Sequence, residues 1–405
     1  MTTIKKSEKL DNVCYDIRGP VLQEAKKLEE EGYTLIKLNI GNTAPFGFYT
    51  PEAIIRDIVI NMKDAQGYGD AQGVFSARNA IVLDLQTKGI MDVGIDDIFI
   101  GNGVSELITI AMQGLLNSND EVLVPMPDYP LWTAAVTLAG GKPVHYRCDE
   151  SADWNPDLAD IRSKVTSRTK ALVVINPNNP TGAVYDRVIL EGIAAIAAEK
   201  NLVVYSDEIY GRITYDGARY IPMATINPDI LTISFDGLSK AYRAPGLRCG
   251  WMSLSGNKKC AANYIEGLIM LSNMRLCSNM TAQFGIQTAL GGFQSIKDFL
   301  LPGGRLKEQR DISVEMVNRI PGLSVTNPKG ALYCFPKVDC KRFNITDDEK
   351  FIIDLLRAKH LLLVHGTGFN WDVPDHFRIV FLPERATLAE AITRLGEFLE
   401  TYKQK

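Results

Sequence analysis

The sequence has no long apolar run. Its longest stretch without a charged residue, residues 276–296, contains Ser, Asn, Thr, Gln and Gly and is too polar to span a membrane as a helix. The N-terminal residues MTTIKKSEKLDNV include lysines but no apolar segment behind them, so they do not resemble a secretory signal peptide. We therefore expect a cytoplasmic protein without a membrane segment.

The sequence also lacks a charge excess and a pattern of metal ligands. It has 44 Lys plus Arg against 48 Asp plus Glu, with no long run of one sign, so nucleic acid is not an expected partner. The seven cysteines are scattered and form no CxxC pair, which fits neither a disulfide framework nor a structural zinc site. The four histidines show no ligand spacing either, so no metal is expected.

Several motifs of common enzyme classes are missing. Walker A, GxSxG and HExxH do not occur in the chain. The nearest dinucleotide fingerprint, at Gly67, Gly69 and Gly73, is one residue too long and follows no predicted strand. A second, at Gly101 and Gly103, lacks the third glycine. These absences argue against P-loop, serine-hydrolase, zinc-protease and dinucleotide chemistry.

What the chain does contain is an α/β pattern. Its 405 residues, 46% of them hydrophobic, exceed what one core usually serves and predict two or three structural units. From residue 98 onward, short apolar strands alternate with helical patterns, which is typical of a mostly parallel sheet covered on both faces. We predict a large domain over 46–285 with a seven-stranded sheet. The predicted strands include 98–100, 121–124, 171–175, 202–205, 230–235 and 251–254, and the helices include 104–117, 131–139 and 187–199.

A smaller α+β domain is predicted over 286–405, where the pattern changes. Residues 1–45 contain a helix from Pro20 to Glu31 and a strand at 35–38, too little apolar material to fold alone. This N-terminal arm is expected to pack with the smaller domain. The predicted C-terminal elements are helices at 304–320 and 347–358, strands at 361–364 and 376–382, and a closing helix from Thr387.

Polar residues follow four of the predicted strands, where open α/β sheets bind their ligands. They are the amide-rich turn NPNNPTG at 176–182, Asp207 in SDEIY, Lys240 in GLSK, and the glycine loop that leads to Val104 and Ser105. Each has a structural alternative: a Pro/Asn turn, a helix cap, a solvated lysine or a plain loop. A partly desolvated lysine is a nucleophile for carbonyls, and amides at a helix start bind phosphate. Together they predict a pyridoxal 5′-phosphate site, which needs a Schiff-base lysine, an acid for the pyridine nitrogen and a phosphate seat.

The chain resembles, over nearly its whole length, the fold-type I aminotransferases of the aspartate aminotransferase superfamily. The motifs NPNNPTG, SDEIY and GLSKAYRAPGLRCGW carry this resemblance. The segments YDIRGP, LNIGN, MPDYPLW and DHFRIVFLP are further similar to the bacterial alanine-forming branch of the family. The resemblance implies a homodimer with its active sites at the interface.

The resemblance also assigns cofactor residues. Lys240 matches the Schiff-base lysine that also moves the substrate proton, and Asp207 the acid that keeps the pyridine nitrogen protonated. Asn179 and Tyr210 match the donors to the phenolic oxygen, and Tyr129 the ring stacked on the cofactor. Lys240, Asp207 and Tyr129 are therefore the expected catalytic residues.

The phosphate seat and the substrate contacts follow in the same way. Val104, Ser105 and Arg248 match the phosphate seat, and Tyr68 matches the tyrosine that reaches the phosphate of the neighbouring subunit. One departure is Gly237, where many relatives have a serine that binds the phosphate.

Arg378 matches the arginine that grips the substrate α-carboxylate, with Asn179 and Gly41 beside it. The arginine that binds a distal carboxylate in the aspartate enzymes has no exact counterpart, because Arg275 is one residue out of register. A mobile cation on the N-terminal arm, Arg18, is the preferred candidate for that role. A surface role for Arg18 and a substrate role for Arg275 are the alternatives.

The resemblance implies transamination between L-alanine and 2-oxoglutarate. Within the same scaffold, an aromatic or kynurenine-type aminotransferase or a β-lyase is the alternative, since fold and cofactor residues do not decide the reaction. A cofactor-sensing transcription regulator is the alternative of another class. It is disfavoured because only some forty residues precede the predicted sheet and no basic patch is present.

Overall fold

The computed structural model describes residues 3–11, 13 and 19–405. Its largest feature is an eight-stranded sheet with the order β2-β9-β8-β7-β6-β3-β4-β5. The five strands from β8 to β4 are mutually parallel, whereas β9 and β5 run antiparallel to their neighbours. The strands are β2 (Ile98–Gly101), β3 (Glu121–Met126), β4 (Lys142–Asp149), β5 (Asn155–Pro156), β6 (Thr169–Ile175), β7 (Val203–Asp207), β8 (Thr232–Gly237) and β9 (Gly250–Ser255).

The sheet therefore has eight strands rather than the predicted seven. The eighth, β5, is a two-residue strand that pairs with β4 at the edge of the sheet. The sequence pattern did not reveal β4 itself, because Lys142–Asp149 is mostly polar and only partly buried. A strand next to the edge of the sheet, as β4 is, lacks the continuous apolar run that marks a central parallel strand.

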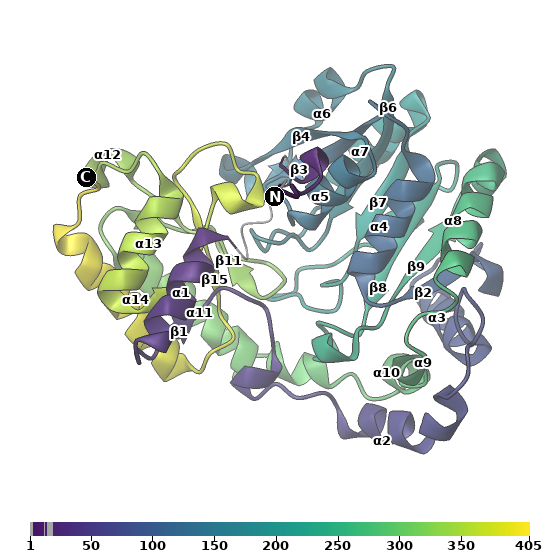
Figure 1. The fold of residues 1–405 in the computed structure, drawn as a ribbon, viewed down its shortest axis with the longest axis horizontal. Helices are drawn as coiled ribbons and strands as arrows, with labels where there is room; N and C mark the ends of the chain where they lie inside the picture. The colour runs from purple at the N-terminus through teal and green to yellow at the C-terminus, as the bar shows by residue number, and fades with distance from the viewer. Residues whose placement is uncertain (1–2, 12, 14–18) are drawn as a thin grey trace.

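Helices cover both faces of the sheet because its central strands are apolar on both sides. In β6, Val173 packs in one buried cluster with residues of α4, α5 and α8, whereas its neighbours Leu172 and Val174 pack in another with residues of α6 and α7. Figure 1 shows these helices around the strands on the right. The helices of this unit are α2 (Glu52–Ile60), α3 (Phe75–Thr87), α4 (Val104–Leu115), α5 (Leu131–Leu138), α6 (Leu158–Lys164), α7 (Arg187–Lys200), α8 (Ala262–Met274), α9 (Met280–Gln283) and α10 (Ile286–Gly291).

A second, smaller unit lies on the left of Figure 1 and combines α1 and β1 with the C-terminal part of the chain. Strand β1 near the N-terminus pairs in parallel with β13, and α1 packs against α13. A three-stranded sheet, β11-β15-β14, forms its centre. The elements are α1 (Pro20–Glu30), β1 (Ile36–Lys37), α11 (Arg305–Arg319), β10 (Leu323–Ser324), β11 (Tyr333–Cys334), β12 (Lys337–Val338), α12 (Cys340–Phe343), α13 (Asp348–Lys359), β13 (Leu361–Leu362), β14 (Val364–His365), β15 (Phe377–Val380) and α14 (Arg385–Thr401).

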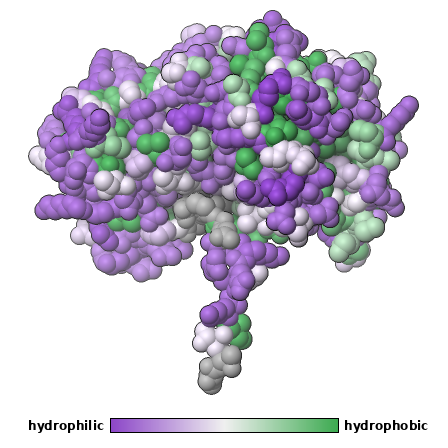
Figure 2. Space-filling view, turned by 90° about the horizontal axis from the view of Figure 1, so that it is seen from above, coloured by the Kyte–Doolittle hydropathy of each residue, from purple (hydrophilic) through white to green (hydrophobic). Residues whose placement is uncertain are grey.

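The surface is mostly hydrophilic in the view of Figure 2. Residues 3–11 are exposed along their whole length and project from the body of the molecule in that view. Within the described part of the chain, every helix is too short or too polar to cross a membrane.

Candidate active site

The carboxyl ends of β6, β7 and β8 bring the predicted residues together. Asp207 is the last residue of β7 and lies opposite Ile175 of β6 and Phe235 of β8. The turn that carries Asn179 begins directly after β6, and its Asn176 amide donates a hydrogen bond to the Asp207 carbonyl at 3.0 Å. Parallel neighbours end at one edge of the sheet, so residues distant in sequence share one space there.

Asp207 is a buried acid, and none of its hydrogen-bond partners among the described residues is a cation. Its side chain accepts a hydrogen bond from Trp132 Nε1 at 3.1 Å and a longer one from the Ile209 amide at 3.4 Å. Burial raises the pKa of Asp207 to about 6, although the Trp132 hydrogen bond acts against it. A protonated ring nitrogen beside this carboxyl group would supply the missing positive charge.

Lys240 lies three residues beyond the end of β8, and its amine is held at the site by backbone. The Nζ atom donates a hydrogen bond to the Gly41 carbonyl at 3.0 Å. A Cβ atom added at Gly41 would overlap the Tyr333 hydroxyl and lie 3.3 Å from Lys240 Nζ. Gly41 therefore allows the backbone to approach the lysine closely.

Tyr333 belongs to the same cluster, although the sequence analysis did not include it. Its hydroxyl lies 2.7 Å from the hydroxyl of Tyr210. Burial acts to raise the pKa of Tyr333, but the positive charges of Lys240 and Arg378 outweigh it, so the pKa is lowered. For Tyr210, burial raises the pKa. The only sequence signal for Tyr333 was its place in the alternating segment ALYCF of the smaller unit.

Arg378 joins this cluster from β15 of the smaller unit. Its Nη1 atom donates a hydrogen bond to Asn179 Oδ1 at 2.9 Å, and its Nη2 atom donates one to the Asn39 carbonyl. The guanidinium group also lies over the Tyr333 ring, 4.4 Å from its centroid. A planar cation fixed on three sides suits the two-point recognition of a carboxylate.

The predicted phosphate seat lies at the start of α4. Val104 and Ser105 open this helix after Gly103, which has a φ of 81°. Arg248 Nη2 donates hydrogen bonds to Ser105 Oγ at 3.1 Å and to the Asn102 carbonyl at 3.2 Å. Free backbone amides and one guanidinium group together form a site suited to a phosphate.

The structure explains the glycine at position 237. Gly237 pairs with Gly250 in the β8–β9 ladder. A Cβ atom at Gly237 would lie 2.8 Å from the Cys249 carbonyl oxygen and 2.9 Å from the Gly250 Cα atom. A serine at this position would therefore require the backbone of β9 to move.

Four candidates remain: Tyr68, Tyr129, Arg275 and Arg18. Tyr68 is 82% exposed, and Tyr129 is partly buried against the cluster that covers one face of the sheet. Arg18 lies outside the described residues. Arg275 donates hydrogen bonds from Nη2 to the carbonyls of Ile100 at 2.7 Å and Ala71 at 3.2 Å.

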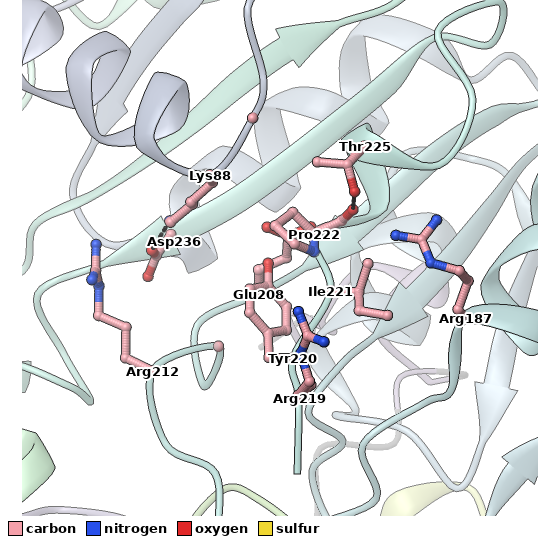
Figure 3. Close-up of a pocket in the computed structure, with 12 residues that line it drawn as sticks. Lys88, Arg187, Glu208, Arg212, Arg219, Tyr220, Ile221, Pro222, Thr225 and Asp236 are labelled. Atoms are coloured by element: carbon pink, nitrogen blue, oxygen red, sulfur yellow. Dashed lines mark hydrogen bonds and ion pairs between the residues drawn. The ribbon is translucent and has the colours of Figure 1, made fainter. Parts of the chain in front are cut away.

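A separate cleft of about 500 Å³ contains none of the predicted site residues (Figure 3). Lys88 pairs there with Asp84 at 2.9 Å and lies 3.8 Å from Asp236, while Arg212 also pairs with Asp84. Glu208 accepts hydrogen bonds from two serines and from one backbone amide. These charged groups already have partners within the protein, so they do not need a charged ligand to compensate them.

Comparisons with known proteins agree with the geometry of the site. The sequence model of the family described as "Aminotransferase class I and II" matches residues 33–395. The chain is 59% identical over 404 residues, all of both chains, to the glutamate-pyruvate aminotransferase AlaA of Haemophilus influenzae. It is 55% identical to the alanine aminotransferase of Mycobacterium tuberculosis, covering 98% of this chain and 93% of that protein. A crystal structure of an aminotransferase from Escherichia coli superposes with a TM-score of 0.99 at 59% identity, over the whole of both chains.

Proposed function

Because the chain belongs to the class I and II aminotransferase family, we propose that it is an alanine transaminase that uses pyridoxal 5′-phosphate. It transfers the amino group of L-alanine to 2-oxoglutarate, giving pyruvate and L-glutamate, and the reaction is reversible. Full-length identity of 59% to a glutamate-pyruvate aminotransferase supports this substrate pair. The observation that carries the chemistry is that Lys240 and Arg378 both lie close to Tyr333, whose hydroxyl is 2.7 Å from that of Tyr210. Asp207 is in turn close enough to Tyr210 to affect its charge.

The residues present fit the cofactor in charge and donor type. Val104 and Ser105 offer backbone amides to the phosphate and Arg248 offers a positive charge. Asp207 would keep the pyridine nitrogen of the cofactor protonated, and Asn179 and Tyr210 would donate hydrogen bonds to its phenolic oxygen. When bound, pyridoxal phosphate stabilises the negative charge that forms at the substrate Cα and carries the amino group between the two half-reactions.

The remaining side chains bind and orient the reactants. Tyr129 would stack on the pyridine ring of the cofactor, and Arg378 would bind the substrate α-carboxylate through two hydrogen bonds and so orient the substrate towards Lys240. The amine of Lys240 removes the proton from the substrate Cα in one half-reaction and returns a proton to Cα in the other half-reaction. Asn179 anchors Arg378 at 2.9 Å and so links substrate and cofactor binding.

The working unit in this proposal is a homodimer in which Tyr68 serves the phosphate of the partner subunit. Large apolar side chains are exposed on and next to α2, α3 and α8, which supports an interface there: Ile55, Val59, Ile60, Met62, Phe75, Met270, Met274 and Leu276. Mixed dimers of Tyr68→Ala and Lys240→Ala subunits test this. One site then carries both changes and the other neither, so activity returns in part; no recovery would place Tyr68 within its own subunit's site.

The distal carboxylate of glutamate is assigned to Arg18. Arg275 is already bound to two backbone carbonyls and lies 3.7 Å from Glu106, which favours Arg18 over it. One pocket must accept both the methyl group of alanine and the second carboxylate of glutamate, and an unpaired charge fixed opposite the methyl group would be costly to bury. Arg18→Ala should weaken the glutamate half-reaction far more than the alanine half-reaction. A selective loss in Arg275→Ala instead would reassign this role.

The overall proposal is tested with purified protein and a panel of half-reactions. The protein should be yellow, and borohydride reduction followed by peptide mapping should label Lys240. Alanine and glutamate should convert the cofactor faster than aromatic amino acids or kynurenine do, with pyruvate and 2-oxoglutarate as products. Elimination products such as ammonia with no 2-oxoglutarate requirement would instead indicate a β-lyase.

A further inference from the structure

His376 is a fully buried histidine that lies between acids from the two units of the molecule. Its Nδ1 atom is 2.6 Å from Oδ1 of Asp375, the preceding residue in the smaller unit. Its Nε2 atom is 3.5 Å from Oε1 of Glu150, which directly follows β4 in the large unit. Each ring nitrogen therefore faces a carboxylate, and the two carboxylates belong to different units.

The positions of Asp375 and Glu150 favour the protonated, positively charged form of the imidazole ring. A neutral histidine has one N–H donor and one lone pair, so either Asp375 or Glu150 would face a lone pair. Only the protonated ring presents N–H groups to both. Lys337 completes the cluster at 2.8 Å from Glu150 and 3.7 Å from Asp375, so two cations face two anions.

The aromatic side chains around His376 exclude water and hold the ring in place. Phe335 stacks on it with a centroid distance of 4.8 Å. Trp154 of the large unit and Trp371 of the smaller unit contact it edge-on at 5.2 and 5.3 Å. Burial acts to lower the pKa of His376, but the hydrogen bond and charge of Asp375, together with Glu150, outweigh it and raise the pKa above 6.5.

His376 also lies two residues before Arg378. Two backbone hydrogen bonds hold the start of strand β15 in place. The His376 carbonyl accepts one from the Gly366 amide at 2.8 Å, and the Phe377 amide donates one to the Pro336 carbonyl. Residues 376 and 378 point to the same side of an extended chain. A displacement of His376 relative to Glu150 therefore moves Arg378 relative to Asn179 of the large unit.

We propose that protonated His376 ties the large unit to the strand of Arg378 and so positions Arg378 for the carboxylate of every substrate. His376 is a positioning residue, because it acts through Arg378. The inference rests on the proposed transaminase activity and adds a charge requirement to it. Substrates bind tightly while His376 is protonated and more weakly as the pH rises through its pKa.

The first test measures the charge of His376 directly, without activity. Histidine labelled with ¹³C gives an NMR signal for each of the four histidines of the holoenzyme, and His376→Gln identifies one of them. That signal should titrate above pH 6.5 and should move to lower pH in Glu150→Gln. Titration at or below 6.5 would overturn the proposal, whether or not the protein transaminates.

The second test separates KM from kcat. In His376→Gln, KM for alanine, glutamate, pyruvate and 2-oxoglutarate should rise together by about threefold to thirtyfold, with kcat little changed and with no remaining pH dependence of KM. His360→Asn, at an αL position in the same unit, is the matched control and should leave KM unchanged. The positioning role would be overturned if His376→Gln left KM unchanged, or if it lowered kcat without raising KM.

If His376→Gln does not fold, Glu150→Gln provides a second test. Glu150→Gln keeps the shape of the side chain and removes only the charge from the large unit. Its KM profile should shift to lower pH together with the His376 signal. If KM stays constant while the signal shifts, His376 does not position Arg378. An absence of transamination with every amino acid would refute the proposed function and leave the NMR titration standing.

Discussion

Strands β7 and β8 carry charged residues to two regions on opposite faces of the sheet, and these regions use charge differently. On one face, Asp207 is buried with no cation bound to it among the described residues, and Lys240 contacts the Gly41 carbonyl and the Tyr333 hydroxyl. On the other face, in the cleft of Figure 3, Asp236 faces Lys88, and Glu208 accepts three hydrogen bonds. Adjacent residues of β8 reach different faces because side chains alternate along a strand: Phe235 packs with α4, α5 and α8, whereas Asp236 lines the cleft.

The difference shows how a site can be told from a structural cluster. In the cleft, Asp84 is paired with both Lys88 and Arg212, so its charge is already neutralised inside the protein. In the candidate active site, Asp207 and Lys240 form no ion pair within the described part of the chain, and contacts with neutral groups hold them in place. Charges that are fixed in position but not neutralised are available to a charged cofactor and substrate.

The largest expected effect separates the two lysines. Lys240→Ala should reduce transamination on the order of 10⁴-fold or more, because no other group replaces the amine as nucleophile and proton carrier. Lys88→Ala should keep kcat/KM within about twofold, since Lys88 serves only the cleft. Steady-state assays and the visible absorption of the bound cofactor measure both. Comparable losses in the two variants would remove the distinction between the regions.

The second effect separates two arginines. Arg378→Lys should lower kcat/KM roughly 10²–10³-fold for alanine and glutamate alike, because an ammonium group cannot copy the two-point fork on the α-carboxylate. The paired control is Arg212→Lys, which retains a cation beside Asp84 and should leave both half-reactions near their original rates. A loss confined to one amino acid would show that Arg378 does not bind the α-carboxylate.

A smaller effect is expected from the hydroxyl of Tyr333. Tyr333→Phe removes the 2.7 Å contact with Tyr210 and one polar group near Lys240, and should lower kcat/KM on the order of tenfold. Tyr402→Phe is the control, because the Tyr402 hydroxyl binds Asp354 at 3.0 Å away from the site. Equal rates in both variants would assign Tyr333 a packing role only.

A substitution beside the cleft should have the smallest effect on catalysis and should change the stability of the protein instead. Asp84→Asn should lower the free energy of unfolding by about 1.5–3 kcal/mol at neutral pH and leave kcat/KM within about twofold. Burial acts to raise the pKa of Asp84, but Lys88 and Arg212 outweigh it and lower the pKa below 3.8. The stability is therefore present above pH 3.8 and is lost as the pH falls through the lowered pKa.

Urea unfolding of both proteins at one fixed protein concentration measures this difference. The two curves should be separate at pH 7 and approach each other in acid. A gap that is constant down to low pH would mean that Asp84 stabilises the protein by shape and not by charge.

The sequence alone determined the local parts of this protein. The apolar runs of β6, β7 and β8 predicted a mostly parallel sheet, and the segments that follow them placed Asn179, Asp207 and Lys240 at one edge of it. Such features depend on a few neighbouring residues, through alternation and turn chemistry, so they can be read without knowledge of the rest.

Only the tertiary structure decided the contacts between distant segments. Trp132 binds Asp207 across 75 positions, Tyr333 meets Tyr210 across 123, and Glu150 faces His376 from the other unit. The polar strand β4 and the close approach of β9 to Gly237 depend in the same way on what packs against them. These arrangements arise when two separately patterned units pack together, and no local pattern records which side chains will then meet.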